Sequence, residues 1–247
     1  MGWVRRSSVL YPPAWAGPRS YGSWLPPVQA GIRIWALIAA FGALLAGGMM
    51  APAAAADSPV KIVALGDSLT AGFNLPASAA FPPRLQKALA AKGLAVQVAN
   101  AGVSGDTASG GLARLDWSVP EGTEAVIVEL GANDMLRGID PAVTRTALDA
   151  IVRRLTERRI VVLLAGMRAI PNLGIEYVKG FETIYSDIAS SYDLVYYPFF
   201  LEGIAGDAKF NQRDGLHPSA AGVDVVVAGI LPKAEELVAR VLKARAK

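Results

Sequence analysis

The chain of 247 residues contains no cysteine and only one histidine. Without cysteine it can form no disulfide, no thiolate zinc site and no cysteine nucleophile. Any imidazole chemistry must therefore use His217, which is the single histidine. About half of the residues are hydrophobic, so the chain can bury one sizeable core.

Acidic residues are missing from the first part of the chain. The only charged residues before Asp57 are four arginines: Arg5, Arg6, Arg19 and Arg33. Without these four, the formal net charge of +3 becomes −1. The remainder has no basic stripe with interleaved aromatic residues, which is the pattern of a nucleic-acid-binding surface. We therefore expect no nucleic-acid partner.

Residues 34–56 form an uncharged, mostly apolar run that follows the arginines and ends in small residues. This order is typical of a secretory signal peptide with an A-x-A exit. We expect cleavage after Ala56, which makes residues 1–56 a leader and residues 57–247 an exported domain, periplasmic or secreted. The run is also long enough to span a bilayer. An uncleaved N-terminal anchor, and membrane contact through it, is therefore the alternative.

From Val60 onward, short apolar runs alternate with longer amphipathic segments. This alternation predicts an α/β fold, a flavodoxin-like three-layer α/β/α arrangement with a five-stranded parallel sheet. The predicted strands are residues 60–65, 95–99, 125–130, 160–165 and 194–197. The predicted helices are residues 79–91, 141–158, 175–191 and 219–244. Ligands bind beyond the carboxyl ends of the strands in such sheets, so chemistry is expected in the loops that follow them.

The first predicted strand runs directly into G-D-S-L-T-A-G, residues 66–72. A serine on a strand-to-helix turn has its hydroxyl toward the cleft and its backbone N–H available as a donor. Ser68 is thus a candidate nucleophile. Taken alone, the pattern favours a structural role instead, in which Ser68 caps a helix in a polar turn.

Two more turns follow the second and third predicted strands. They read N-A-G-V-S-G-D-T, residues 100–107, and G-A-N-D, residues 131–134. Gly105 would let the backbone approach a bound acyl group and offer its N–H to a developing oxyanion. Asn133 could donate a side-chain amide hydrogen to the same oxyanion. Each motif alone is also compatible with an ordinary turn.

Close to the C-terminus, D-G-L-H-P occupies residues 214–218, just before the last predicted helix. The spacing lets the carboxylate of Asp214 accept a hydrogen bond from one imidazole nitrogen of His217, while the other nitrogen faces the serine hydroxyl. A lone histidine is more often structural than catalytic. Here it is the only histidine of the chain, and it has a carboxylate neighbour.

Together, these four blocks resemble the four signature blocks of the SGNH (GDSL-type) serine hydrolases, over residues 60 to about 235. Within this superfamily the blocks look especially like those of the bacterial group of thioesterase I, arylesterase and lysophospholipase. They read ALGDSLTAG, NAGVSGDTASGGLARL, VELGANDMLRG and DGLHP. The resemblance implies that residues 57–247 form the catalytic domain. It further implies a Ser68 nucleophile, with His217 as base and Asp214 as its orienting partner. The implied oxyanion donors are the N–H groups of Ser68 and Gly105 and the side chain of Asn133.

No metal or other cofactor is expected. Three aspartates, Asp67, Asp106 and Asp134, could suggest a carboxylate metal site. Each lies in a turn beside a motif residue. Local hydrogen bonding to the backbone is therefore the preferred interpretation.

Apolar residues that follow the fourth and fifth predicted strands could line a substrate pocket: Met167, Ile170, Pro171 and Phe199. Alternatively, Phe199 and Phe200 belong to the core under the last helix. The expected partner is a small molecule, namely a carboxylic ester, an acyl thioester or a lysophospholipid. Two other functions stay open: an exported O-acetylesterase acting on cell-envelope carbohydrate, and a non-catalytic, membrane-tethered binding module.

Overall fold

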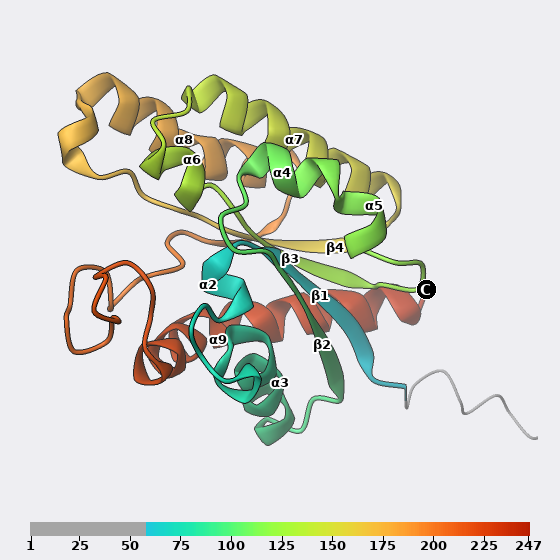
Figure 1. The fold of residues 1–247 in the computed structure, drawn as a ribbon. Helices are drawn as coiled ribbons and strands as arrows, with labels where there is room; N and C mark the ends of the chain where they lie inside the picture. The colour runs from blue at the N-terminus through green and yellow to red at the C-terminus, as the bar shows by residue number, and fades with distance from the viewer. Residues whose placement is uncertain (1–57) are drawn as a thin grey trace, which may run out of the picture. The chain divides into compact units, whose positions relative to one another are not determined.

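Residues 58–247 are described by a computed structural model, so the expected leader lies outside the described residues. The described residues contain a sheet of five parallel strands in the order β2-β1-β3-β4-β5 (Figure 1). This order is the flavodoxin-like one, and the predicted fold class is confirmed. The strands are β1 Val60–Gly66, β2 Val96–Gly102, β3 Ala125–Glu129, β4 Val161–Ala165 and β5 Val195–Tyr197.

Helices cover both faces of the sheet (Figure 1). On one face α3 and α9 pack against each other, and on the other α7 lies between α4 and α8. The four long helices match the predicted ones: α3 Phe81–Ala91, α7 Pro141–Glu157, α8 Ile175–Ser191 and α9 Ala220–Arg245. The short elements were not predicted: α2 Ser68–Ala71, α4 Ala108–Ala113, α5 Leu115–Ser118, α6 Ala132–Leu136, and the 3-10 turns η2 Ala77–Ala79 and η3 Pro171–Leu173.

Local sequence explains where the long helices begin. Pro141 occupies the first turn of α7, and the Asp140 side chain accepts a hydrogen bond from the N–H of Ala142. Ser219 caps α9 in the same way, with its hydroxyl bonded to the N–H of Gly222. The start of α3 is two residues later than predicted because Ala77–Ala79 form a separate 3-10 turn.

Strand order places the candidate motifs at one edge of the sheet. From β1 the chain passes first to β2 on one side and later to β3 on the other side. The loops that leave β1 and β3 therefore border a crevice at the carboxyl ends of the strands, where α/β proteins bind ligands. Among residues 58–247, no helix has both the length and the apolar character needed to cross a membrane.

Candidate active site

Ser68 begins helix α2, directly after strand β1. Asp67 caps this helix, because its Oδ1 accepts a hydrogen bond from the N–H of Leu69 at 2.9 Å. The strand ends at Gly66, where a Cβ atom would overlap the Thr70 hydroxyl and the side chain of Glu129. The absence of a side chain at residue 66 therefore allows the tight turn that brings Ser68 to the crevice.

His217 links Ser68 to Asp214. Its Nε2 lies 2.9 Å from Ser68 Oγ, and its Nδ1 lies 2.8 Å from Asp214 Oδ2. Asp214 Oδ1 also accepts hydrogen bonds from the backbone N–H groups of His217 (3.0 Å) and Leu216 (2.9 Å). These two backbone bonds, together with the imidazole, lower the pKa of Asp214 to about 2. The carboxylate is therefore ionised at any ordinary assay pH.

The loop that carries His217 is fastened by Gln212, a residue that the sequence analysis missed. The backbone N–H of Gln212 donates to the His217 carbonyl at 2.7 Å, and its side-chain amide donates to the carbonyls of Phe73 (2.8 Å) and Pro218 (3.0 Å). Phe73 follows α2, so Gln212 joins the histidine loop to the serine turn. The Phe73 ring also packs on the imidazole, with 4.5 Å between ring centroids.

Gly105 is the third residue of a turn from Val103 to Asp106, closed by a 3.1 Å backbone hydrogen bond from Asp106 to Val103. Its φ of +83° is a left-handed value that glycine adopts freely. The carbonyl of Gly105 accepts a 2.6 Å hydrogen bond from Arg137. Its N–H has no hydrogen-bond acceptor among residues 58–247.

Asn133 lies in the first turn of α6, after strand β3, and lines the same pocket as Ser68 and His217. Its side-chain Nδ2 donates to Asp67 Oδ2 at 3.0 Å. The structure therefore brings the predicted residues of the first, third and fourth motifs together around one pocket. Gly105 is not among the residues that line it.

The expectation that the three aspartates bond to local backbone is correct for one oxygen of Asp67 and wrong for Asp106 and Asp134. Asp106 forms a 2.6 Å ion pair with Arg114. Asp134 accepts hydrogen bonds from the N–H of Ala108 (2.8 Å) and the hydroxyl of Thr144 (3.0 Å). Both carboxylates bond to residues of other segments, because the short helices α4 and α6 bring residues that are distant in the sequence beside them. No cluster in the described part of the chain has the three or more acidic or histidine residues needed for a metal site.

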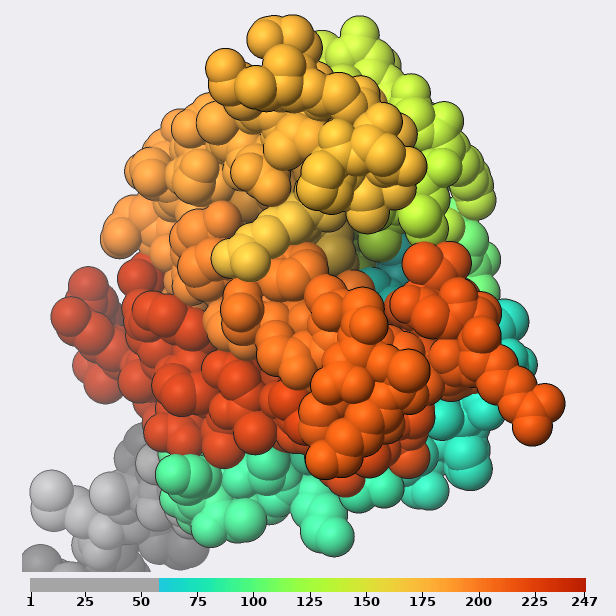
Figure 2. Space-filling view, turned by 90° about the vertical axis from the view of Figure 1, so that its left-hand side faces the viewer, coloured from blue at the N-terminus to red at the C-terminus, as the bar shows by residue number. Residues whose placement is uncertain are grey.

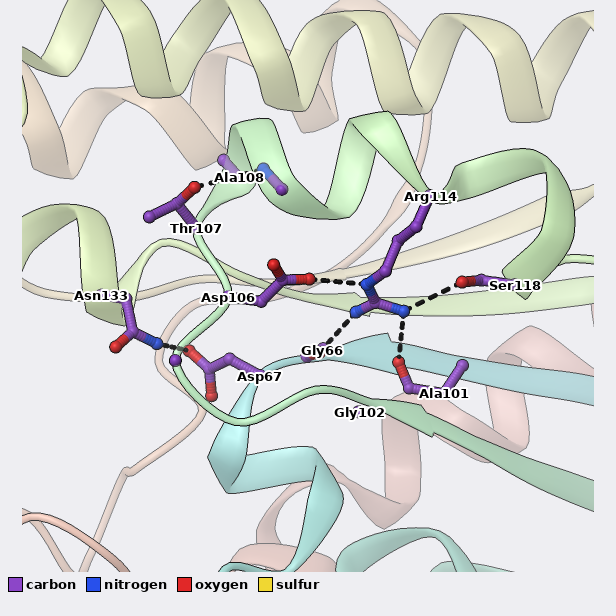
Figure 3. A network of polar contacts seen from close by, with 12 residues as sticks. Gly66, Asp67, Ala101, Gly102, Asp106, Thr107, Ala108, Arg114, Ser118 and Asn133 are labelled. Carbon is purple, nitrogen blue, oxygen red and sulfur yellow. Dashed lines mark hydrogen bonds and ion pairs between the residues drawn. The ribbon is translucent and has the colours of Figure 1, made fainter.

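Arg114 is a second residue that the sequence analysis missed (Figure 3). Its side chain is buried and, besides Asp106, donates to the carbonyls of Gly66 and Ala101 at 2.8 Å each and to Ser118 Oγ at 3.0 Å. Gly66 and Ala101 lie at the carboxyl ends of β1 and β2. One guanidinium thus holds together the two strand ends and the loop that contains Gly105.

Glu129, at the end of β3, is a third missed residue. It is completely buried next to Asp67, and its Oε2 accepts a 2.7 Å hydrogen bond from Thr70. Burial raises the pKa of both carboxyls, that of Asp67 to about 6 and that of Glu129 well above its ordinary value, with repulsion from Asp67 adding to the latter. In the sequence, the signal that could have identified Glu129 is a single carboxylate within an otherwise apolar predicted strand.

The pocket beside Ser68 has a volume of about 470 Å³ and mostly apolar walls. In Figure 2 the surface is hollowed between the yellow segment that follows β4 and the orange segment that follows β5. Met167, Ile170 and Phe199 line the pocket as expected, whereas Pro171 is exposed and does not. Phe200 instead packs in the core, edge-on to the ring of Phe81. Further apolar lining comes from Leu69, Met135, Leu136, Leu201 and Leu216.

Comparison with known proteins gives one consistent result. Residues 64–225 match the model of the GDSL-like lipase/acylhydrolase family. The chain is 37% identical to Esterase TesA of Pseudomonas aeruginosa over 177 residues. This alignment covers 71% of this chain and 88% of TesA. It is 39% identical to thioesterase 1/protease 1/lysophospholipase L1 of Escherichia coli over 168 residues. This alignment covers 68% of this chain and 78% of the relative. The crystal structure of AlinE4, an SGNH-hydrolase family esterase, matches with a TM-score of 0.62 and 42% identity, covering 73% of this chain and 96% of that one.

Proposed function

Because the chain belongs to the GDSL-like lipase/acylhydrolase family, we propose that it hydrolyses carboxylic esters or thioesters with Ser68 as nucleophile, His217 as base and Asp214 as orienting carboxylate. The observation that carries this proposal is the continuous chain of contacts from Ser68 Oγ through the imidazole to Asp214, at 2.9 and 2.8 Å. Both distances are within hydrogen-bond range for a nucleophile, its base and the orienting group.

In the acylation step, His217 Nε2 removes the hydroxyl proton of Ser68 while Oγ attacks the acyl carbonyl carbon. The carbonyl oxygen of the resulting tetrahedral intermediate becomes negatively charged. The backbone N–H groups of Ser68 and Gly105 and one amide hydrogen of Asn133 are the proposed donors to this oxyanion. The intermediate collapses when the bond to the leaving oxygen or sulfur breaks, and that atom takes the proton from the imidazolium.

Deacylation repeats the sequence with water. His217 removes a proton from the water as its oxygen attacks the acyl carbon, and the bond to Ser68 Oγ then breaks with return of the proton to the serine. The products are a carboxylic acid and the alcohol or thiol released earlier. Asp214 accepts from the imidazole Nδ1–H, which leaves the Nε2 lone pair directed at Ser68 and stabilises the imidazolium.

The apolar pocket supports an acyl or aryl chain as the group that binds beside Ser68. Side chains such as Met167, Phe199 and Leu201 offer hydrocarbon contact and few hydrogen-bond partners for sugar hydroxyls. We therefore propose acyl esters, aryl esters, acyl thioesters and lysophospholipids as the substrate class. An open groove with polar or aromatic walls would favour a cell-envelope O-acetylesterase, whereas most side chains that line this pocket are apolar and not aromatic.

The decisive experiment uses the Ser68→Ala variant and an active-site label. The variant should remain folded and lose activity on p-nitrophenyl esters by several orders of magnitude, because the acyl-enzyme route is gone. The wild-type protein should react with a fluorophosphonate probe and the variant should not. Absence of labelling in the wild type would favour the non-catalytic binding module, and near-normal turnover by Ser68→Ala would overturn the assignment.

We further propose that residues 1–56 direct export and that residues 57–247 are the catalytic domain. The support is the order of arginines, apolar run and small residues in the leader. Mass spectrometry of the protein recovered from the periplasm or the medium should find Asp57 at the N-terminus. Recovery of the intact chain in the membrane fraction would instead support an uncleaved anchor.

A further inference from the structure

The side-chain amide of Asn133 has a fixed partner on one side. Its Nδ2 donates to Asp67 Oδ2 at 3.0 Å, between the loops that follow β3 and β1 (Figure 3). An amide nitrogen carries two hydrogens, so this bond leaves the second N–H for the pocket that Asn133 shares with Ser68 and His217. The bond to Asp67 therefore sets the direction of the donor that faces the substrate.

Asp67 is suited to this task because both of its oxygens are already engaged. Oδ1 accepts the N–H of Leu69 at 2.9 Å and Oδ2 accepts the Asn133 amide, while the side chain is completely buried. A carboxylate anion only accepts hydrogen bonds. It therefore excludes the flipped amide, in which Asn133 would turn its oxygen toward Asp67 and move its nitrogen away from the present position.

The neighbouring Glu129 explains how a buried anion persists here. Its Oε2 accepts the Thr70 hydroxyl at 2.7 Å and lies 3.4 Å from the backbone nitrogen of Asp67, whereas its Oε1 is buried without a partner among the described residues. The negative charge of Asp67 disfavours ionisation of Glu129. Burial raises the pKa of Glu129 well above its ordinary value, whereas the pKa of Asp67 rises to about 6, so Asp67 carries the charge at pH 8.

We propose that Asp67 is a positioning residue for the oxyanion site: its buried carboxylate holds the amide of Asn133 so that one N–H points to the substrate carbonyl oxygen. Asp67 touches neither substrate nor reacting atoms and acts only through Asn133. This inference rests on the proposed function, in particular on Asn133 as an oxyanion donor.

Two substitutions at residue 67 separate this role from helix capping. Asp67→Asn keeps the shape but has one acceptor oxygen, so it cannot serve both Leu69 and Asn133 as an acceptor. Asp67→Ser keeps a good N-cap for α2 but is too short to hold the Asn133 amide. Asp140→Asn is the matched control, because Asp140 caps α7 with a similar 2.8 Å bond to the Ala142 N–H.

The experiment is a double-mutant cycle with Asn133→Ala, measured as kcat and KM on p-nitrophenyl butyrate at pH 8, where Asp67 is ionised. Each substitution at Asp67 should lower kcat by at least about tenfold and leave KM within about twofold, as expected for a group that acts on the transition state. In the Asn133→Ala background the same substitutions should change kcat by less than about twofold. The control Asp140→Asn should leave both constants unchanged.

The outcomes are distinct. An equal loss of kcat in both backgrounds would overturn the inference and assign the effect to another route, such as the attraction between the Asp67 charge and protonated His217. A full rate in Asn133→Ala would instead refute the oxyanion role of Asn133 in the proposed function. If Asp67→Asn does not fold, the cycle with Asp67→Ser alone decides, since that variant retains the cap.

Discussion

Replacing Asp214 by asparagine tests how the imidazole is oriented. In the native protein Oδ1 accepts two backbone N–H groups and Oδ2 accepts the imidazole Nδ1–H. An asparagine that keeps the two backbone bonds places its NH₂ group against Nδ1. The imidazole must then carry its proton on Nε2, and a protonated Nε2 cannot take the proton of Ser68.

The magnitude follows from counting hydrogen bonds. The opposite orientation of the introduced asparagine would restore the right tautomer but set its NH₂ group against the N–H groups of Leu216 and His217, so two bonds are lost. At a factor of roughly five per bond, the productive orientation is disfavoured roughly 25-fold. Loss of the charged hydrogen bond to the imidazolium contributes a further factor of roughly 10 to 150. We therefore expect kcat to fall by roughly 250- to 4000-fold.

Asp214→Ala is the informative comparison. The Asp214 side chain is 36% exposed, so in this variant water can accept the Nδ1–H and nothing imposes the wrong tautomer. We expect Asp214→Ala to be at least about tenfold more active than Asp214→Asn. The assay is kcat on p-nitrophenyl butyrate for both variants, with thermal melts to confirm folding. An asparagine variant equal to or better than the alanine variant would refute the tautomer argument.

Three further predictions concern other parts of the molecule. Phe199→Ala should lower kcat/KM for octanoyl relative to acetyl esters by roughly tenfold, because an acyl chain loses apolar contact, whereas Pro171→Ala should leave that ratio unchanged; equal effects would contradict the pocket assignment. Glu129→Gln should raise the melting temperature at pH 8 more than at pH 5. The pKa of Glu129 is higher in the folded than in the unfolded protein, so the wild type loses stability as the pH rises above the unfolded-state pKa, whereas glutamine does not titrate. If variant and wild type differed in melting temperature by the same amount at both pH values, Glu129 would not be protonated in the fold. Expression of residues 57–247 alone should give the same specific activity as the full chain, and an insoluble product would mean that the domain boundary is misplaced.

The strands and long helices could be predicted because each buries a continuous or periodic apolar pattern. Residues 175–191 were predicted with both ends correct, since the helix is long and amphipathic. The short helices α4 and α6 have too few residues to show a period, and α4 contains two glycines. They were therefore expected as loops.

The same gap explains the missed site residues. Arg114 follows α4 directly, so its meeting with Asp106 depends on a helix that the pattern did not indicate. Gln212 bonds to a carbonyl 139 residues away, and no local pattern encodes a contact of that range. Ser68, His217 and Asp214 could be identified because the spacing of the motifs, and their resemblance to a known family, mark them without reference to the tertiary contacts.

The tether formed by Gln212 has a consequence for heat inactivation. His217 lies near the end of the segment between β5 and α9, which has no helix or strand of its own, and a side-chain hydrogen bond from Gln212 to the Phe73 carbonyl fastens this part of the segment to the serine turn. Segments held by few contacts open at a lower free-energy cost than the sheet. We therefore expect hydrolytic activity to disappear on warming while the strands still protect their amides from hydrogen exchange, so that the loop with His217, and not the core, would limit the operating temperature.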